Sequence, residues 1–61
     1  MIHVSIAEDL PEIRHALERM ISSEADMALA SSSSNAEDAM TAIKNAQPDV
    51  VIMDINMPGM S

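Results

Sequence analysis

Three acidic residues, Glu8, Asp9 and Asp54, each come directly after a stretch of sequence that predicts a strand. Carboxylate oxygens are ligands that Mg²⁺ prefers, and an aspartate carboxylate can also act as a nucleophile that accepts a phosphoryl group. On residue type, Asp9 and Asp54 are the natural metal ligands, and Asp54 is also the candidate acceptor. The backbone carbonyl of Asn56 lies close enough along the chain to coordinate the same ion. These residues predict a site for Mg²⁺ and a phosphoryl group if the fold brings them together.

The acidic pair Glu8-Asp9 is expected between a strand and a helix. Apolar residues at every second position predict the strand over residues 2–7. Asp9 is expected to cap the helix, whose first turn tolerates Pro11 because the missing N–H has no helical partner there. An apolar stripe at helical spacing continues this helix to about Ser22; its members are Ile13, Ala16, Leu17, Met20 and Ile21.

The rest of the chain predicts another strand, a second helix and a third strand. Residues 26–31 are weakly apolar and favour an edge strand. A capping-box spacing starts at Ser34 and predicts a second helix, which Pro48 ends because proline cannot continue it. Residues 50–53 are four consecutive apolar residues, a run that is typical of a parallel strand buried on both faces.

The alternation of strands and helices with short connections predicts an α/β fold, namely one βαβαβ half of a doubly wound parallel sheet. Ligands of such sheets bind beyond the carboxyl ends of the strands. Glu8, Asp9 and Asp54 all follow strands at that edge. Their carboxylates converge if the first and third predicted strands are neighbours.

Composition excludes some classes of function and favours others. The chain has 61 residues, no cysteine and a formal net charge of −7, so it offers no basic patch for nucleic acid. Its first residues lack the features of a signal peptide, and it has no apolar run of the ~20 residues that a membrane span needs. We therefore expect a soluble, cytoplasmic protein segment that contacts neither nucleic acid nor membrane.

This chain resembles the receiver domains of two-component response regulators over its whole length, most of all those of the LuxR/NarL type, and two segments carry the resemblance. One segment is the acidic pair followed by Leu10-Pro11 and a helix; the other is residues 47–61, QPDVVIMDINMPGMS. The acidic pair alone is a weak signal, but its combination with a later strand that is followed directly by Asp-x-x-Met-Pro-Gly is specific.

The resemblance implies a flavodoxin-like sheet with strand order 2-1-3. It implies that Asp54 accepts a phosphoryl group from a sensor histidine kinase and that Glu8 assists in the acidic pocket. It further implies that Mg²⁺ is held by Asp9, Asp54 and the Asn56 carbonyl. The module would be a phosphoacceptor rather than an enzyme, and its parent protein a transcriptional regulator that binds DNA through another domain.

The same resemblance predicts that residues 1–61 are a truncated receiver domain. Receiver domains are roughly twice as long as this chain, and their second half carries a hydroxyl residue and a lysine that stabilise the phosphoryl group. Lys44 and Thr41 are predicted on the second helix and cannot replace them. We therefore expect the remaining half and any output domain to be absent, and this fragment to be incomplete for activity.

Alternative interpretations of the acidic residues remain open. Asp54 could cap the loop after its strand, and Glu8 and Asp9 could serve helix capping alone. An aspartate after an apolar strand also occurs in phosphotransferases of the haloacid-dehalogenase type, although these usually carry a second aspartate where this chain has Asn56. Arg14, with Glu18 and Arg19, predicts either a solvated helix face or, by the resemblance, a surface that faces the kinase.

Three further expectations concern packing and assembly. Met20, Met40 and Met53 lie on predicted core faces and are expected to fill the core. His3 and His15 lie away from the carboxyl ends of the strands and are assigned no role. The third strand would have a bare edge, so we expect a homo-oligomer through this edge or through swapped elements, which makes a self-associating structural fragment the third alternative.

Overall fold

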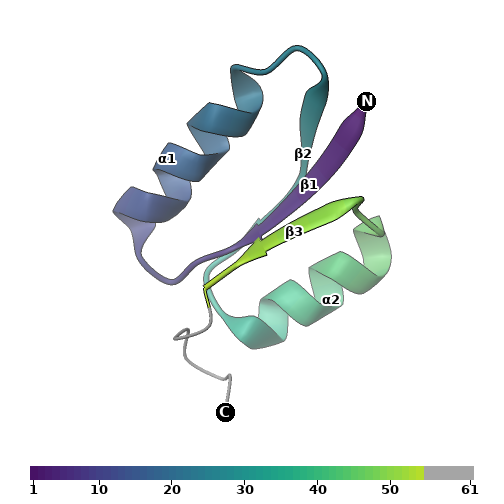
Figure 1. The fold of residues 1–61 in the computed structure, drawn as a ribbon. Helices are drawn as coiled ribbons and strands as arrows, with labels where there is room; N and C mark the ends of the chain where they lie inside the picture. The colour runs from purple at the N-terminus through teal and green to yellow at the C-terminus, as the bar shows by residue number, and fades with distance from the viewer. Residues whose placement is uncertain (55–61) are drawn as a thin grey trace.

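Three strands and two helices alternate along residues 1–54, the part of the chain that the structure describes. The computed structural model gives their bounds as β1 Ile2–Ala7, α1 Pro11–Ser22, β2 Met27–Ser33, α2 Ala36–Ala46 and β3 Val50–Met53 (Figure 1). All strand pairs are parallel and the order in the sheet is β2-β1-β3. This confirms the predicted βαβαβ arrangement and the strand order 2-1-3.

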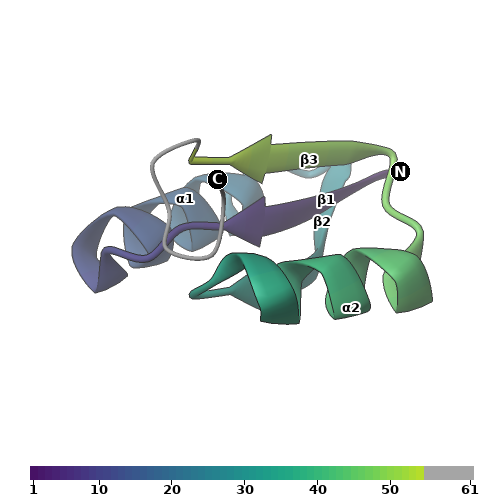
Figure 2. The same cartoon turned by 90° about the horizontal axis from the view of Figure 1, so that it is seen from below.

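The central strand β1 supplies side chains to both faces of the sheet, because successive residues of a strand point to opposite sides. Val4 and Ile6 form one core cluster with Ile21 of α1, and Leu17 and Met27 pack against it. Ala7 belongs to a second cluster on the other face, with Ala36, Ala39, Ile43 and Met53. The helices accordingly lie on opposite faces of the sheet (Figures 1 and 2).

The residues at the N-caps of the two helices differ from those predicted. The residue before α1 is Leu10, and no side chain caps this helix, so the prediction that Asp9 is its cap is wrong. Pro11 occupies the first turn as expected. The cap of α2 is Asn35 rather than Ser34, since the Asn35 Oδ1 accepts the backbone N–H of Asp38 at 2.8 Å.

The end of α2 sets the path into β3. Gln47 adopts a left-handed conformation with φ of 48°, and its N–H donates to the Ile43 carbonyl at 2.8 Å. This closes the last turn in the manner of a helix C-cap, directly before Pro48. The helix therefore stops where the proline predicted.

The two outer strands differ in how well the helices cover them. β2 is an edge strand, as predicted, but it extends to Ser33 rather than ending at residue 31. The prediction that residues 50–53 are buried on both faces is wrong, because Val50, Val51 and Ile52 are 46, 40 and 37% exposed. The reason is that β3 pairs with β1 along one side, while α1 and α2 pack over β1 and β2.

The methionine prediction is correct for one of its three residues. Met53 is partly buried against the Ala7 cluster. Met20 and Met40 are each 64% exposed, because Leu17, Ile21, Ala39 and Ile43 already fill the surfaces between the helices and the narrow sheet. Within residues 1–54, neither helix has the length or the apolar character that crossing a membrane requires.

Candidate functional site

The ends of β1 and β3 present acidic residues side by side. Ala7 and Met53, the last residues of these strands, are paired in the sheet. The backbone N–H of Asp54 donates to the Ala7 carbonyl at 3.1 Å, and the backbone N–H of Glu8 donates to the Ser33 carbonyl of β2 at 3.0 Å. Strand pairing thus continues one residue beyond the strands and fixes the main chain of both acids.

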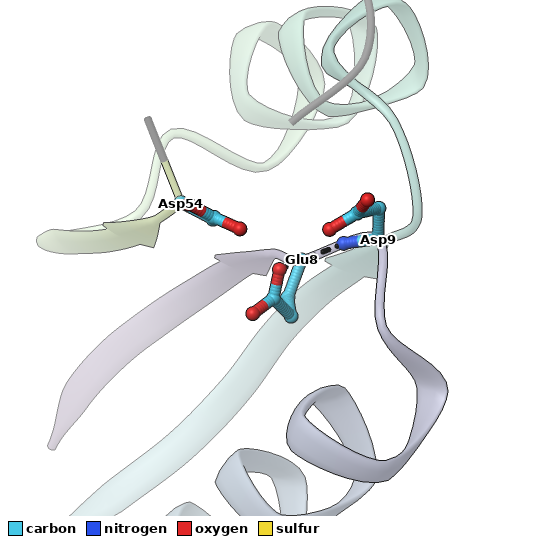
Figure 3. A group of neighbouring side chains, drawn as sticks. All are labelled: Glu8, Asp9 and Asp54. Carbon is cyan, nitrogen blue, oxygen red and sulfur yellow. Dashed lines mark hydrogen bonds between the residues drawn. The ribbon is translucent and has the colours of Figure 1, made fainter. Parts of the chain in front are cut away.

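The carboxylates of Glu8, Asp9 and Asp54 form one cluster, in which one oxygen of each lies within 4.8 Å of the others. Figure 3 shows the side chains of Asp9 and Asp54 pointing toward each other from neighbouring segments, with Glu8 beside them. Glu8 is buried, whereas Asp9 and Asp54 are half-buried. The structure therefore brings together three of the four residues that the sequence singled out.

The fourth residue is Asn56, whose backbone carbonyl was predicted as a metal ligand with Asp9 and Asp54; it lies outside the described residues, which end at 54. The donor set that is described consists of carboxylate oxygens from three acids. Mg²⁺ is a hard cation that prefers such oxygens and usually keeps several waters, so a half-open group of carboxylates suits it. The residues present therefore fit a hard divalent cation.

The electrostatics of the cluster are unfavourable for negative charge. Burial raises the pKa of Glu8 above its ordinary value, and hydrogen bonding to the side chains of Asp54 and Asp9 and the charge of Asp54 raise it further. The backbone N–H of Asp9, which donates to the Glu8 Oε2 at 2.9 Å, opposes this and lowers it. A bound cation would favour the ionised form of these carboxylates, because it attracts groups that otherwise repel one another.

One cationic residue touches the loop that carries the cluster. The Arg14 Nη1 of α1 donates to the backbone carbonyl of Glu8 at 3.0 Å. Sequence reasoning placed Arg14 on a solvated or kinase-facing surface and missed this contact, although its position in the first turns of the helix that follows the acidic pair is the signal that could have found it. The guanidinium ties α1 to the segment that orients Glu8 and Asp9.

Comparison with known proteins identifies the family. The family model described as response regulator receiver domain matches residues 4–61. This chain belongs to the response regulator receiver family. The match selects the receiver interpretation over the haloacid-dehalogenase alternative, and it places the chain among the phosphoacceptor modules of two-component systems.

The relatives of this receiver chain are named for different functions. It is 42% identical over 59 residues to the transcriptional regulatory protein DesR of Bacillus subtilis, covering 97% of this chain and 30% of DesR. It is 38% identical over 58 residues to a protein-glutamate methylesterase/protein-glutamine glutaminase of Nitrosospira multiformis, covering 95% of this chain and 16% of that protein. The uncharacterized transcriptional regulatory protein YvfU of Bacillus subtilis is 43% identical over 58 residues, covering 95% of this chain and 29% of YvfU. The chain thus spans less than a third of the length of these relatives.

Proposed function

We propose that Asp54 is the residue that accepts a phosphoryl group, delivered by a sensor histidine kinase, and that this transfer is the function of the receiver. The observation that carries the proposal is the gathering of Glu8, Asp9 and Asp54 within 4.8 Å at the carboxyl edge of a parallel sheet. Three carboxylates gathered in this way would bind a cation, and the cation would offset the repulsion between the charge of Asp54 and the incoming phosphoryl oxygens.

The transfer itself is a substitution at phosphorus. An oxygen of the Asp54 carboxylate attacks the phosphorus atom of a phosphohistidine, forming an O–P bond as the P–N bond breaks. The electron pair of the broken bond stays on the imidazole nitrogen, which then takes a proton from solvent. Asp54 suits the attack because its backbone is fixed by the bond to the Ala7 carbonyl and its side chain points toward the cluster (Figure 3).

Asp9 and Asp54 would hold Mg²⁺ together with the backbone carbonyl of Asn56. When bound, the ion supplies positive charge that offsets repulsion between the carboxylates and the phosphoryl oxygens. Glu8 would assist from the buried side of the cluster. In support, no side chain caps α1, so Asp9 is not engaged in the helix capping that was its alternative role.

The domain to which these residues belong is proposed to be longer than the chain. Residues 1–61 would be the first half of a receiver, and the hydroxyl residue and the lysine that stabilise the phosphoryl group would belong to its second half. The parent would be a cytoplasmic transcriptional regulator that binds DNA through an output domain. The relatives named as transcriptional regulatory proteins, at 42 and 43% identity, support this more than the methylesterase at 38%.

The test is phosphorylation by acetyl phosphate with Mg²⁺, applied to the 61-residue chain and to its full-length parent. We expect the parent to incorporate phosphate and Asp54→Asn to abolish the incorporation. Asp26→Asn is the matched control, because Asp26 is an exposed aspartate outside the cluster. Equal labelling of the parent with and without Asp54 would show that another residue is the acceptor.

A further inference from the structure

The opposite end of the β1–β3 pair carries a reciprocal contact between two residues that the acidic site does not use. The backbone N–H of Asp49 donates to the His3 carbonyl at 2.8 Å, and the backbone N–H of His3 donates to the Asp49 Oδ2 at 2.8 Å. The same Oδ2 lies 3.5 Å from the imidazole Nδ1 of His3. One aspartate thus binds the main chain of β1 through both its backbone and its side chain.

The side-chain bond extends the pairing beyond the end of the strand. The N–H and the carbonyl of His3 both face the β3 side of β1, but His3 precedes the first paired residues of the two strands, Val4 and Val50. An N–H at the end of a ladder lacks a backbone acceptor on the neighbouring strand, and here the Asp49 carboxylate takes the place of that acceptor.

The position of β3 depends on few contacts. The strand has four residues, pairs with β1 along one side, and leaves Val50, Val51 and Ile52 exposed by 37% or more, so core packing constrains it weakly. A slip of one residue along β1 would shift Asp54 by about 3.3 Å and turn the side chains of β3 to the opposite faces. Such a slip would remove Asp54 from the acidic cluster.

We propose that Asp49 is a positioning residue, whose carboxylate fixes the register of β3 on β1 from the amino end and so holds Asp54 against Glu8 and Asp9 at the carboxyl end. The structural part of this inference concerns the register alone, and its consequence for phosphorylation rests on the proposed function of Asp54.

The charges around Asp49 agree with this role. The backbone N–H of His3 lowers the pKa of Asp49, and the imidazole of His3 and the N-terminal ammonium group lower it further, while partial burial opposes them. The carboxylate is therefore ionised, and accepting, over the whole neutral range. The side chains of His3 and Asp49 are 56 and 60% exposed, so their ion pair contributes little and the main-chain bond carries the effect.

The experiment measures amide hydrogen exchange by NMR in the 61-residue chain and in four variants. The reporter is the Asp54 N–H, bonded to β1, and the internal reference is the Glu8 N–H, bonded to β2. Asp49→Ala is expected to speed exchange at Asp54 about three- to tenfold, the range for one lost hydrogen bond, and to leave Glu8 unchanged. Asp49→Asn keeps an acceptor oxygen and is expected to restore protection to within about twofold of the unmodified chain.

Two further variants separate the contributions. His3→Ala removes the imidazole but keeps the backbone N–H, so it is expected to change exchange at Asp54 by less than about twofold. Asp26→Ala removes one exposed negative charge elsewhere and is expected to change nothing. Unchanged exchange at Asp54 in Asp49→Ala, an equal rise at Glu8, or a failure of Asp49→Asn to restore protection would each overturn the inference.

The functional readout is the rate of phosphorylation of the full-length parent by acetyl phosphate. Asp49→Ala is expected to lower this rate about three- to tenfold, and Asp49→Asn to restore it. An unchanged rate despite faster exchange at Asp54 would overturn the positioning role. If the unmodified parent were not labelled at Asp54, the proposed function would fail, while the exchange pattern would still decide whether Asp49 sets the register.

Discussion

The two ends of the β1–β3 pair place carboxylates in opposite surroundings. At the amino end, Asp49 accepts the backbone N–H of His3, and this bond is the first cause of its lowered pKa. At the carboxyl end, Glu8 lies buried beside two other acids, and its pKa is raised by burial and by Asp54 and Asp9. An ionised carboxylate therefore stabilises the folded chain at the amino end, where it is Asp49, and destabilises it at the carboxyl end, where it is Glu8.

This difference agrees with the proposed cation site at the carboxyl end. A carboxylate satisfied by the protein itself has little left to offer a ligand, whereas a group of acids that repel one another gains from any cation that enters it. Groups of like charge are unfavourable for stability and are commonly found at functional sites, and the acidic cluster is such a group. Among the described residues, no buried side-chain polar atom lacks a hydrogen-bond partner.

The largest expected effect is on Mg²⁺ binding at the carboxyl end. Asp9→Asn removes one of the three charges that attract the cation, so we expect the Mg²⁺ affinity to fall at least about tenfold. Isothermal titration calorimetry with MgCl₂ measures this affinity, with Asp26→Asn as the variant of equal charge. An Asp9→Asn chain that binds Mg²⁺ as tightly as the control would remove Asp9 from the ligand set and weaken the contrast between the two ends.

A smaller effect is expected on the stability of the metal-free chain. Because the folded pKa of Glu8 lies above its ordinary value of 4.5, its stabilising contribution is present below that pH and is lost as the pH rises through the folded pKa. Charged Glu8 is therefore unfavourable at neutral pH, and Glu8→Gln is expected to raise the melting temperature there by a few degrees.

The pH dependence of that gain distinguishes repulsion from packing. The difference in melting temperature between Glu8→Gln and the unmodified chain should shrink as the pH falls below 4.5, where Glu8 is protonated in both states. Circular dichroism melts with a chelator present provide the measurement, and added Mg²⁺ should reverse the order of stability. A gain that stayed constant across this range would mean that the substituted side chain packs better and that repulsion is not the cause.

The sequence was sufficient to predict the elements that position the site. Alternation over residues 2–7 identified the first strand, and Pro11 and Pro48 identified where one helix begins and the other ends. Period and proline chemistry are local properties, so a single sequence carries them. The meeting of Glu8, Asp9 and Asp54 followed from the rule that carboxyl ends of parallel strands share one edge, once β1 and β3 were taken as neighbours.

The errors concern features that depend on distant parts of the chain. Asp9 has the type and spacing of a helix cap, yet it lies in a cluster with Asp54, which is far away in sequence. Residues 50–53 have the composition of a buried strand, but their burial depends on what lies on either side of them. The contact of Asp49 with His3 was not predicted at all, because the two residues are 46 positions apart and no local pattern links them.

The smallest expected effect separates the two groups of His3 that act on Asp49. Because the folded pKa of Asp49 lies below its ordinary value of 3.8, its stabilising contribution is present above that pH and is lost as the pH falls through the folded pKa. The backbone N–H of His3 is the larger cause and the imidazole the smaller, so His3→Ala should move the Asp49 titration midpoint only slightly upward.

Carboxyl ¹³C shifts followed by NMR during an acid titration measure that midpoint directly. A midpoint that returned to 3.8 in His3→Ala would assign the effect to the imidazole, and the amino end would then be held by an exposed ion pair, which salt weakens, rather than by the main chain.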